Sequence, residues 1–563
     1  MVPIKAEIRA AITQALHRAG LASRVPLGLA EEVDIPEFMV SSPREEKFGD
    51  FAANIAMQLA KPARRPPRDV AAVILKHFDY GACPWVERIE VAGPGFLNFY
   101  LRPQWLQEAL RQVIEQGERF GRSLVGAGRK VNVEFVSANP TGLLHMGNAR
   151  GAALGDSIAA LLDFCGFDVT REFYINDTGL QIERFAASLE ALYLQEFGED
   201  VPVPEDGYHG ADLAATVKRF IAETGETYRH APPGERREAL ARFAVAEKVA
   251  AIRDSLEKFG VRYDVWFSEQ ELHLSGAVER VIRELTARGE TYEREGALWF
   301  KAEKHGVEKD EVLVRSTGAA TYFAADVAYH ANKFDRGFAW LINVWGADHH
   351  GHVPRVKAAL RALGYDADRL DVIIMQLVRL FRGGEIVRMS KRTGEFVTLD
   401  ELLEEVGRDA ARYFFVLRSA DSHLDFDLDL ARAQSMENPV YYVQYAHARI
   451  ASLFRQLSLK GKALPEIGAV DLSVLTSEEE ERLLRKLADF PDEVVDAALD
   501  LAPHRLTGYI YELAGLFHAF YNVHRVIGSE PGIEEARLLL VQAVGIVLRQ
   551  GLRLLGIGAP ERM

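Results

Sequence analysis

The stretch VSANPTGLLHMGNARG, residues 136–151, lies where an apolar strand, KVNVEFV, turns into a helix. Gly142 and Gly147 leave backbone N–H groups open at the start of that helix, where the helix dipole favours an anion. His145 and Asn148 add side-chain donors. The P-loop and the dinucleotide-binding fingerprint are both absent. A lone His beside a Gly is more often structural, so the phosphate-binding interpretation needs a second element.

Strands and helices alternate outward from this junction. The helix NARGAALGDSIAALLDFCGF is followed by a strand DVTREFYIN and by a helix from about residue 177. Further strands are expected in FAWLINVWGADHHGH and DVIIMQLVRLF. This alternation predicts an α/β fold with a parallel, Rossmann-like sheet and crossover helices. A polar, charged segment at about 195–250 is expected to be a helical insertion.

The chain of 563 residues is too long for one core and predicts several domains. Residues 1–115 mix helix and strand signals and predict an α+β domain, in which RIEVAGPGFLNFYL is expected to form two strands around a Gly-Pro-Gly turn. Residues 116–410 form the expected Rossmann-like domain. Residues 411–563 predict an all-α domain, and we expect no strand from about 400 onward. Its long helices are expected near 437–457, 477–498, 503–526 and 533–555.

Composition restricts the class of protein. The net charge is −15, which argues against a non-specific nucleic-acid coat, although the basic stretches KPARRPPRD and RQGLRLL are either solvated surface or local contact patches. No apolar run has the length of a membrane span, and the N-terminal residues lack the core of a secretion signal. Two cysteines exclude a disulfide framework. We therefore expect a cytoplasmic protein with no membrane partner.

The second element is GGEIVRMSKRTGEFVTL, residues 383–399. Glycines flank a short strand and a group of cations that includes Arg388 and Lys391, with Met389 and Ser390 between them. Such a loop suits a polyphosphate, because Lys391 can place a point charge on phosphoryl oxygens. A solvated basic loop is the alternative interpretation, and taken alone it is the better one.

Together, HMGN and RMSK resemble the HIGH and KMSK signatures of class I aminoacyl-tRNA synthetases. The segments YINDTGLQI, WFSEQ, TYFAADVAYHANKF, GRDAARYFFV, ENPVYYVQYAHARI and APERM are similar to those of arginyl-tRNA synthetases. The N-terminal KFGDFAANIAMQLAK looks like that family's extra domain, so the resemblance covers the chain end to end. Asn148 stands for the second His of HIGH and keeps a donor without the charge, while Arg388 stands for the first Lys of KMSK and keeps the charge in a different shape.

The resemblance implies ATP-dependent ligation of L-arginine to arginine tRNA through an arginyl-adenylate. Mg²⁺ is expected with ATP, and catalysis would rest on position and positive charge. The implied catalytic residues are His145, Asn148, Arg388 and Lys391. The implied ATP-binding residues are Gly142, His145, Gly147, Asn148, Asp348, His349, Met389, Ser390 and Lys391. The implied arginine-binding residues are Glu134 and Asn139 for the α-amino and α-carboxylate groups, and Glu269, Tyr322 and Asp326 for the guanidinium.

Several alternatives stay open. His349, His350 and His352 are compatible with a metal site, but carboxylate and cysteine partners are not evident, so we expect no bound zinc. The helical domain is the expected anticodon reader, with Tyr441, Tyr442, Tyr445, His447 and Arg449 either contacting bases or packing internally. The family also implies that tRNA is needed for the first step, and we expect a monomer. The rival functions are a class I synthetase for another amino acid and a non-catalytic tRNA-binding paralogue.

Overall fold

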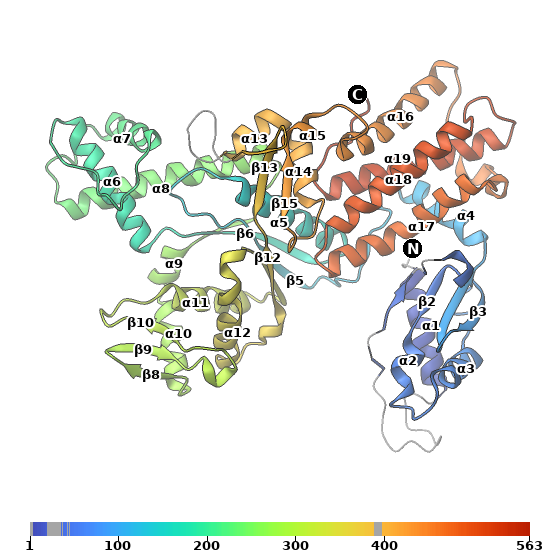
Figure 1. The fold of residues 1–563 in the computed structure, drawn as a ribbon, viewed down its shortest axis with the longest axis horizontal. Coiled ribbons are helices and arrows are strands. Elements are labelled where there is room, and N and C mark those ends of the chain that lie inside the picture. Colours follow the sequence, from blue (N-terminus) through green and yellow to red (C-terminus); the bar gives the residue numbers. More distant parts are fainter. Residues whose placement is uncertain (1–3, 20–34, 37, 42, 44, 388–396) are drawn as a thin grey trace.

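The computed structural model describes residues 4–19, 35–36, 38–41, 43, 45–387 and 397–563. Figure 1 shows the N-terminal domain, in blue, projecting as a separate lobe beside the C-terminal helices. A five-stranded sheet lies centrally, and two further lobes extend from it. No helix in the described part of the chain is long and apolar enough to cross a membrane.

The N-terminal domain pairs a small sheet with helices. Its strands lie in the order β1-β2-β4-β3, and every pair is antiparallel. The predicted hairpin around Gly-Pro-Gly is confirmed by the pairing of β3 with β4. The elements are α1 (Ile4–Arg18), β1 (Val40–Ser41), η1 (Glu46–Phe48), β2 (Phe51–Ala53), α2 (Ile55–Ala60), α3 (Pro67–His77), β3 (Val86–Ala92), β4 (Phe96–Leu101), α4 (Gln104–Gln116) and η2 (Gly117–Arg119).

The central sheet confirms the predicted parallel, Rossmann-like arrangement. Its order is β12-β11-β5-β6-β7, with all neighbours parallel. From β5 the chain continues to β6 on one side of the sheet, and it later returns as β11 on the other side of β5. The strand order therefore reverses between β5 and β11, and ligands bind at such switch points in open α/β sheets. The strands are β5 (Lys130–Glu134), β6 (Asp168–Ile175), β7 (Val265–Ser268), β11 (Trp340–Gly346) and β12 (Leu370–Met375).

Helix α5 (Met146–Phe164) follows the opening stretch and packs closely on the sheet. A Cβ at Gly155 would overlap the ring of Phe135, so glycine is needed for this approach. Farther along, Asp156 of α5 accepts a hydrogen bond from Arg412 at 2.6 Å. Arg412 is fully buried and also donates to the Leu555 carbonyl at 2.8 Å, which ties α5 to the end of the C-terminal domain.

The helical insertion extends beyond the expected range at both ends. It comprises α6 (Gly179–Glu196), α7 (Ala211–Thr224) and α8 (Pro233–Lys258). These helices contact one another and share a separate apolar core that includes Phe185, Tyr193 and Phe220. Helix α6 directly follows β6 and therefore resembles a crossover helix in sequence, although its buried face packs on α7 and α8.

A second lobe, not anticipated from the sequence, lies between β7 and β11. Its three-stranded antiparallel sheet has the order β10-β9-β8 and packs with helices around its own core. Its elements are α9 (Glu269–Leu274), α10 (Ala277–Ala287), β8 (Thr291–Arg294), β9 (Ala297–Phe300), η3 (Glu303–His305), β10 (Glu311–Val314) and α11 (Tyr322–Asp335), with η4 (Ala347–His352), α12 (Val353–Ala362) and η5 (Ala367–Arg369) after β11.

The segment DVIIMQLVRLF forms two strands in different sheets, which corrects the expectation of one. After β12, the chain continues as β13 (Val378–Arg382), which pairs with β14 (Glu385–Val387) and β15 (Leu424–Asp427). The expectation of no strand after about 400 is therefore wrong. Strand β15 has only four residues, too few for its alternation of buried and exposed side chains to stand out. Helices α13 (Leu399–Val406), α14 (Arg408–Val416) and α15 (Leu428–Arg432) surround this sheet.

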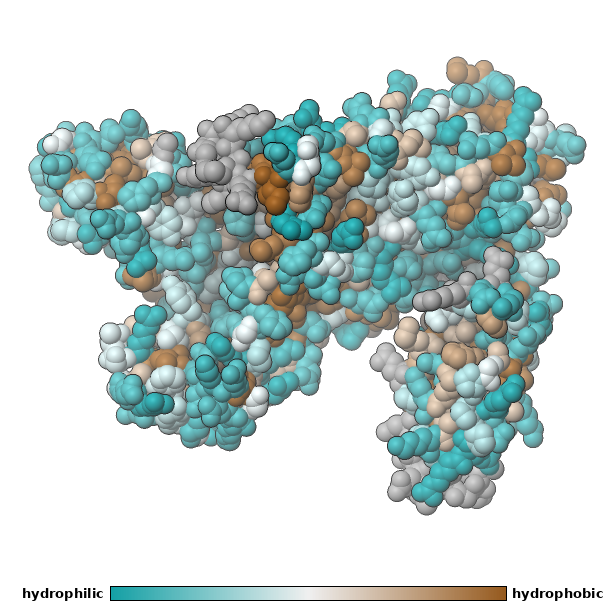
Figure 2. All heavy atoms as spheres, viewed as in Figure 1, coloured by the Kyte–Doolittle hydropathy of each residue, from teal (hydrophilic) through white to brown (hydrophobic). Residues whose placement is uncertain are grey.

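The four long C-terminal helices match the predicted ranges to within a few residues. They are α16 (Pro439–Leu459), α17 (Glu478–Leu499), α18 (His504–Val523) and α19 (Ile533–Leu554), with η6 (Ile467–Ala469) and η7 (Leu472–Val474) before α17. Helix α4 packs on α17 and α19, and Lys5 at the start of α1 pairs with Asp496 of α17 at 3.0 Å. Figure 2 shows a mainly hydrophilic face, with apolar surface gathered near β13 and along these helices.

Candidate active site

One large cavity lies at the carboxyl ends of the central strands. Its volume is about 1610 Å³, and its wall combines the loop after β5, the start of α5, α11, η4 and the segment from β12 to β14. It is lined by these residues that the sequence predicts for the site: Glu134, Asn139, Gly142, His145, Gly147, Asn148, Glu269, Tyr322, Asp326, Asp348 and His349. The predicted residues Arg388, Met389, Ser390 and Lys391 lie outside the described residues. Val387 and Val397, on either side of them, both line the cavity.

The loop after β5 has an unusual backbone. Val136 and Ser137 have φ values of 70° and 42°, which L-residues with side chains seldom adopt. Such strain persists where surrounding contacts hold it, and it concentrates at functional sites. The Ser137 hydroxyl donates to Glu134 Oε1 at 3.0 Å and accepts from the Tyr174 N–H at 3.3 Å. The strained turn thus fastens the end of β5 to β6.

His145 is the N-cap of α5. The Gly147 N–H donates to its Nδ1 at 3.1 Å, so the proton of the neutral ring is carried by Nε2. Partial burial lowers the pKa of His145, although its ring still contacts solvent. Asn148 completes the cap by accepting the His145 N–H at 3.0 Å. The expectation of an open Gly147 N–H is therefore wrong for this structure, because the imidazole occupies it.

The opening stretch also contacts the chain that follows the second basic element. The Leu399 N–H donates to the Leu144 carbonyl at 2.9 Å, and His145 and Thr398 form an isolated antiparallel bridge. Thr398 in turn caps α13. Two segments about 250 residues apart in sequence therefore meet at one end of the cavity.

Acidic side chains gather at another part of the wall. Glu269 is 3% exposed and accepts from the Thr178 hydroxyl at 2.9 Å. Asp326 lies one turn after Tyr322 on α11, and its Oδ2 pairs with His352 Nε2 at 2.7 Å. Burial and the negative charges of Glu269 and Asp326 raise the pKa of Tyr174 far above its usual value. Carboxylates and phenol hydroxyls together suit a cationic, hydrogen-bonding ligand.

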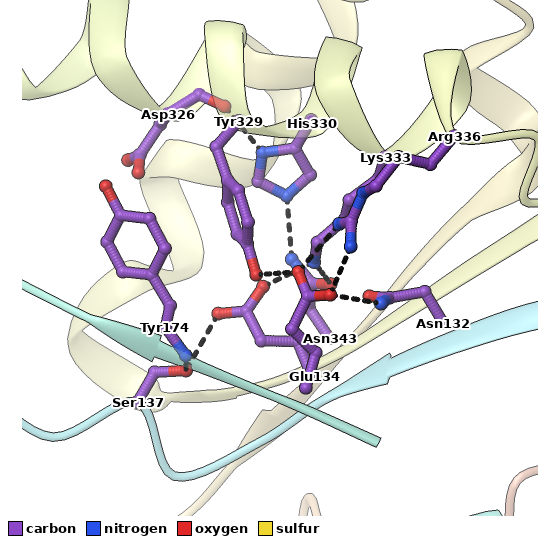
Figure 3. Close-up of polar contacts among 11 residues, drawn as sticks. Asn132, Glu134, Ser137, Tyr174, Asp326, Tyr329, His330, Lys333, Arg336 and Asn343 are labelled. Atoms are coloured by element: carbon purple, nitrogen blue, oxygen red, sulfur yellow. Dashed lines mark hydrogen bonds and ion pairs between the residues drawn. The ribbon is translucent and has the colours of Figure 1, made fainter. Parts of the chain in front are cut away.

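A buried polar network supports this wall from behind (Figure 3). Lys333 of α11 pairs with Glu134 at 2.6 Å and donates to Asn343 Oδ1 at 3.2 Å. Asn343 contacts His330 Nε2 at 2.7 Å, and His330 Nδ1 contacts the Asp326 carbonyl at 2.7 Å. Burial, followed by the charge of Lys333, lowers the pKa of His330 to about 4.

A second buried ion pair lies beside this network. Glu172 of β6 is bonded by Arg336 through both oxygens, at 2.6 and 2.8 Å, and by the Tyr329 hydroxyl at 2.7 Å. Burial would raise the pKa of Glu172, but the Arg336 hydrogen bond and the nearby cations outweigh it and leave the pKa lowered. The bond fixes the ring of Tyr329, which lines the cavity.

These supporting residues were missed from the sequence, although a signal for α11 was present. Tyr322, Asp326, Tyr329 and Lys333 recur at i, i+4, i+7 and i+11, which places polar groups on one helical face. Similarly, Tyr174 and Asn176 stand at the carboxyl end of β6 and line the cavity. The strand-end rule that singled out η4 applies to them equally.

The histidines of η4 take different positions. His349 lies 3.5 Å from Asp348 and beside the Trp345 ring, whereas His352 is directed to Asp326, at the acidic wall. Among the described residues, no group of three or more His, Cys, Asp or Glu side chains is arranged to hold a metal ion.

The aromatic group on α16 divides in two. His447 is 2% exposed, and its Nδ1 contacts the Pro560 carbonyl at 2.9 Å, so it packs internally. Tyr441 and Tyr445 stack with ring centroids 6.1 Å apart, and Tyr442 lies against Tyr511 of α18. Arg449 lies over the Tyr521 ring. Base contacts by the tyrosines stay a prediction.

Three known protein families match successive parts of the chain. The family described as "Arginyl tRNA synthetase N terminal domain" matches residues 6–101. The family described as "tRNA synthetases class I (R), catalytic domain" matches residues 109–421, which is more than half of the chain. The family described as "DALR anticodon binding domain" matches residues 443–563.

Individual relatives match over almost the full length. A protein of Desulforudis audaxviator (strain MP104C) named "Arginine--tRNA ligase" is 63% identical over 559 residues, covering 99% of both chains. The solved Thermus thermophilus arginyl-tRNA synthetase is 28% identical with a TM-score of 0.78, covering 99% of this chain and 100% of that one. A putative arginyl-tRNA synthetase from Campylobacter jejuni is 33% identical with a TM-score of 0.75, covering 82% of this chain and 100% of that one.

Proposed function

The chain belongs to the arginyl-tRNA synthetase family, and on that premise we propose how its cavity is divided between two substrates. It ligates arginine to tRNA with the use of ATP. We assign L-arginine to the acidic wall and ATP to the end at His145. One observation carries this assignment: a single cavity holds the start of α5 and the carboxylates of Glu134, Glu269 and Asp326.

The acidic wall suits the whole arginine molecule. Its guanidinium is planar and always charged, so it requires carboxylates in fixed positions. Glu269 and Asp326 take that role, with the Tyr322 hydroxyl beside them. Glu134 receives the α-ammonium group, and Asn139, at the exposed rim, takes the α-carboxylate.

The His145 end suits the triphosphate. The arginine carboxylate attacks the α-phosphorus, pyrophosphate leaves, and charge grows on the phosphoryl oxygens. His145 then acts as a neutral Nε2–H donor, because its Nδ1 is occupied by the α5 cap. Asn148 holds that cap. Gly142 and Gly147 carry no side chain, which allows a phosphate to approach the backbone closely. Preorganised donors of this kind stabilise the transition state electrostatically.

The remaining ATP contacts complete the proposal. Asp348 and His349, on η4, are assigned to the nucleoside. Arg388, Met389, Ser390 and Lys391 are assigned to the phosphates from the RMSK resemblance, supported by the positions of Val387 and Val397 in the cavity wall. Mg²⁺ would be held mainly by ATP phosphates, as is usual for this ion, and would neutralise their charge.

The tRNA is proposed to span several domains. The helical domain reads the anticodon, the N-terminal domain contacts the elbow, and the 3′ ribose hydroxyl enters the cavity to take the arginyl group. We also propose that tRNA binding completes the arginine site, which makes the first step tRNA-dependent. A monomeric state and a cytoplasmic location are carried forward from the sequence as predictions.

Arginine-dependent ATP–pyrophosphate exchange, measured with and without total tRNA, tests this proposal. We expect exchange with arginine plus tRNA, none with arginine alone, and none with lysine. Exchange without tRNA would overturn the tRNA requirement. Exchange with lysine would overturn the guanidinium assignment.

A further inference from the structure

Lys333 is a buried cation that does not reach the cavity. It is 0% exposed, lies on the inner face of α11 and is not among the residues that line the site. Its ammonium pairs with Glu134 at 2.6 Å, donates to Asn343 at 3.2 Å and lies 4.3 Å from the centre of the Tyr329 ring. A buried charge is tolerated only with such partners, so these contacts fix the position of the ammonium.

Glu134 is held from two sides and faces the cavity. Lys333 takes Oε2, and the Ser137 hydroxyl, from the strained turn, takes Oε1 at 3.0 Å. Glu134 is only 4% exposed, yet it forms part of the cavity wall. Glu134 and Asn343 are register partners on β5 and β11, so Lys333 bridges the two strands at the switch point.

The same lysine sets the direction of a hydrogen-bond chain toward Asp326. Because Asn343 Oδ1 accepts from Lys333, its Nδ2 donates to His330 Nε2 at 2.7 Å. His330 must then carry its proton on Nδ1, which donates to the Asp326 carbonyl at 2.7 Å. Lys333 therefore contacts Glu134 directly and, through Asn343 and His330, reaches the backbone carbonyl of Asp326 (Figure 3).

We propose that Lys333 is a positioning residue for the amino-acid substrate, which keeps the Glu134 carboxylate charged and oriented to receive the α-ammonium group. The inference rests on the proposed function, since it starts from the assignment of Glu134 to that group. Without the lysine, burial favours a protonated carboxyl. A protonated carboxyl has lost the charge and part of the acceptor capacity that an ammonium requires.

Other ionisable groups near Glu134 do not replace the lysine. Arg336 is engaged through two hydrogen bonds by Glu172. The charge of Glu134 also acts on three tyrosines, Tyr174, Tyr263 and Tyr329. Burial raises the pKa of each well above its usual value, so these tyrosines stay neutral. Asp326 and His330 lie on α11, where His330 is neutral because burial lowers its pKa to about 4.

The test compares Lys333→Met with the native enzyme in tRNA-dependent exchange, across about pH 6 to 9. We expect the KM for arginine to rise about 10- to 100-fold, the loss of one charge-assisted contact, with the KM for ATP nearly unchanged. We also expect arginine kcat/KM of the variant to fall as pH is lowered, over a range where the native value changes little, because Glu134 becomes protonated.

Matched variants separate positioning from stability. Lys248→Met removes another buried lysine, which is 5% exposed and forms an ion pair at 2.6 Å. Because Lys248 lies in the helical insertion, the pH profile of this variant should keep the native shape. Glu134→Gln/Lys333→Met has no carboxyl at position 134 that could titrate. Its kcat/KM for arginine should therefore no longer show the added fall at low pH. Lys333→Gln keeps a hydrogen-bond donor without the charge. It should show the fall of arginine kcat/KM at low pH even if Lys333→Met does not fold.

The outcomes distinguish the two proposals. If Glu134→Gln leaves the KM for arginine unchanged, the assignment of Glu134 is wrong and the proposed function needs revision at that residue. If Glu134→Gln raises this KM while Lys333→Met and Lys333→Gln keep both the native KM and the native pH profile, the role of Lys333 is overturned. If the KM for arginine and the KM for ATP both rise, with no added fall of kcat/KM at low pH, the role of Lys333 is purely structural and the positioning role is overturned.

Discussion

At the scale of single residues, the cap that His145 forms on α5 bears directly on the phosphate contact proposed for this residue. Its Nδ1 accepts from the Gly147 N–H, and this contact places the proton of the neutral ring on Nε2, where the proposed phosphate contact requires a donor. Partial burial lowers the pKa of the ring and so favours the neutral form at physiological pH. The cap and the proposed phosphate contact therefore require the same tautomer.

Replacing His145 by Ala should lower the rate of adenylate formation about 10²- to 10³-fold, as for loss of an oxyanion-hole donor. Binding of tRNA, measured separately by filter retention, should change little. His423→Ala, an exposed histidine outside the cavity, provides the control. Normal turnover by His145→Ala would place the phosphate site elsewhere.

Asp326→Asn should raise the KM for arginine about 10- to 100-fold, because a charge-assisted contact to the guanidinium is lost. The KM for ATP should stay within about twofold, since Asp326 lies in the acidic wall. Steady-state exchange with each substrate varied in turn measures both constants. An equal rise in both would contradict the division of the cavity.

The motif residues could be singled out because two short stretches, neither of them decisive alone, together resemble a known family signature. Lys333 could not, because its partner Glu134 lies 199 residues away and only the pairing of β5 with β11 brings them together. Arg412 is a similar case, since its partners come from distant elements. Residues whose roles depend on tertiary contacts leave little local trace in one sequence.

At the scale of elements, predictability followed length and periodicity. The helices α16 to α19 have about twenty residues each and strong signals, so their positions were predicted closely. Strand β15 and the strands of the lobe before α11 have only four residues each, and short strands carry little pattern. The bounds predicted for the helical insertion were wrong because the apolar stripe of a helix does not indicate whether it packs on the central sheet or on other helices.

Helix α11 should make the fold sensitive to acid through His330. Burial lowers the pKa of His330 to about 4, below the 6.5 of an unfolded histidine. Between these values the unfolded chain binds a proton that the folded chain does not, so stability falls as pH falls, by up to about 3 kcal/mol. The urea midpoint of the native protein should therefore drop more steeply below pH 6.5 than that of His330→Asn. Equal slopes would contradict this.

At the scale of the whole molecule, the N-terminal domain docks on acidic residues of α17. Lys5 of α1 pairs with Asp496, and the charges of Asp489 and Asp492 act on it as well. Asp492 is 4% exposed, and burial raises its pKa to about 7, while burial raises the pKa of Asp489 to about 6. Arg505 also pairs with Asp496 at 3.1 Å, whereas the buried Asp492 Oδ2 has no hydrogen-bond partner among the described residues.

The pKa shift of Asp492, and with it the change of stability with pH, has the opposite sign to that of an ordinary ion-paired carboxylate. Its folded pKa lies above the unfolded value of 3.8, so the folded chain holds the extra proton, and stability falls as pH rises toward and through about 7. Asp492→Asn should remove this cost and raise stability at pH 8 by at most about 4 kcal/mol, but at pH 5, only 1.2 units above the unfolded pKa of 3.8, by at most about 2 kcal/mol. Thermal unfolding at the two pH values measures the difference, and a gain that is equal at both would refute the explanation.

The contact between Lys5 and Asp496 joins residues separated by 491 positions. A ribosome adds about 5–20 residues each second, so roughly 25–100 s pass between the emergence of the first helix and that of its docking surface. During that interval the N-terminal domain has only its own small sheet and helices to pack against, beside an unfinished catalytic domain. The antiparallel pairing of β1 to β4 uses only local chain, which makes such early, independent folding feasible in a nascent polypeptide.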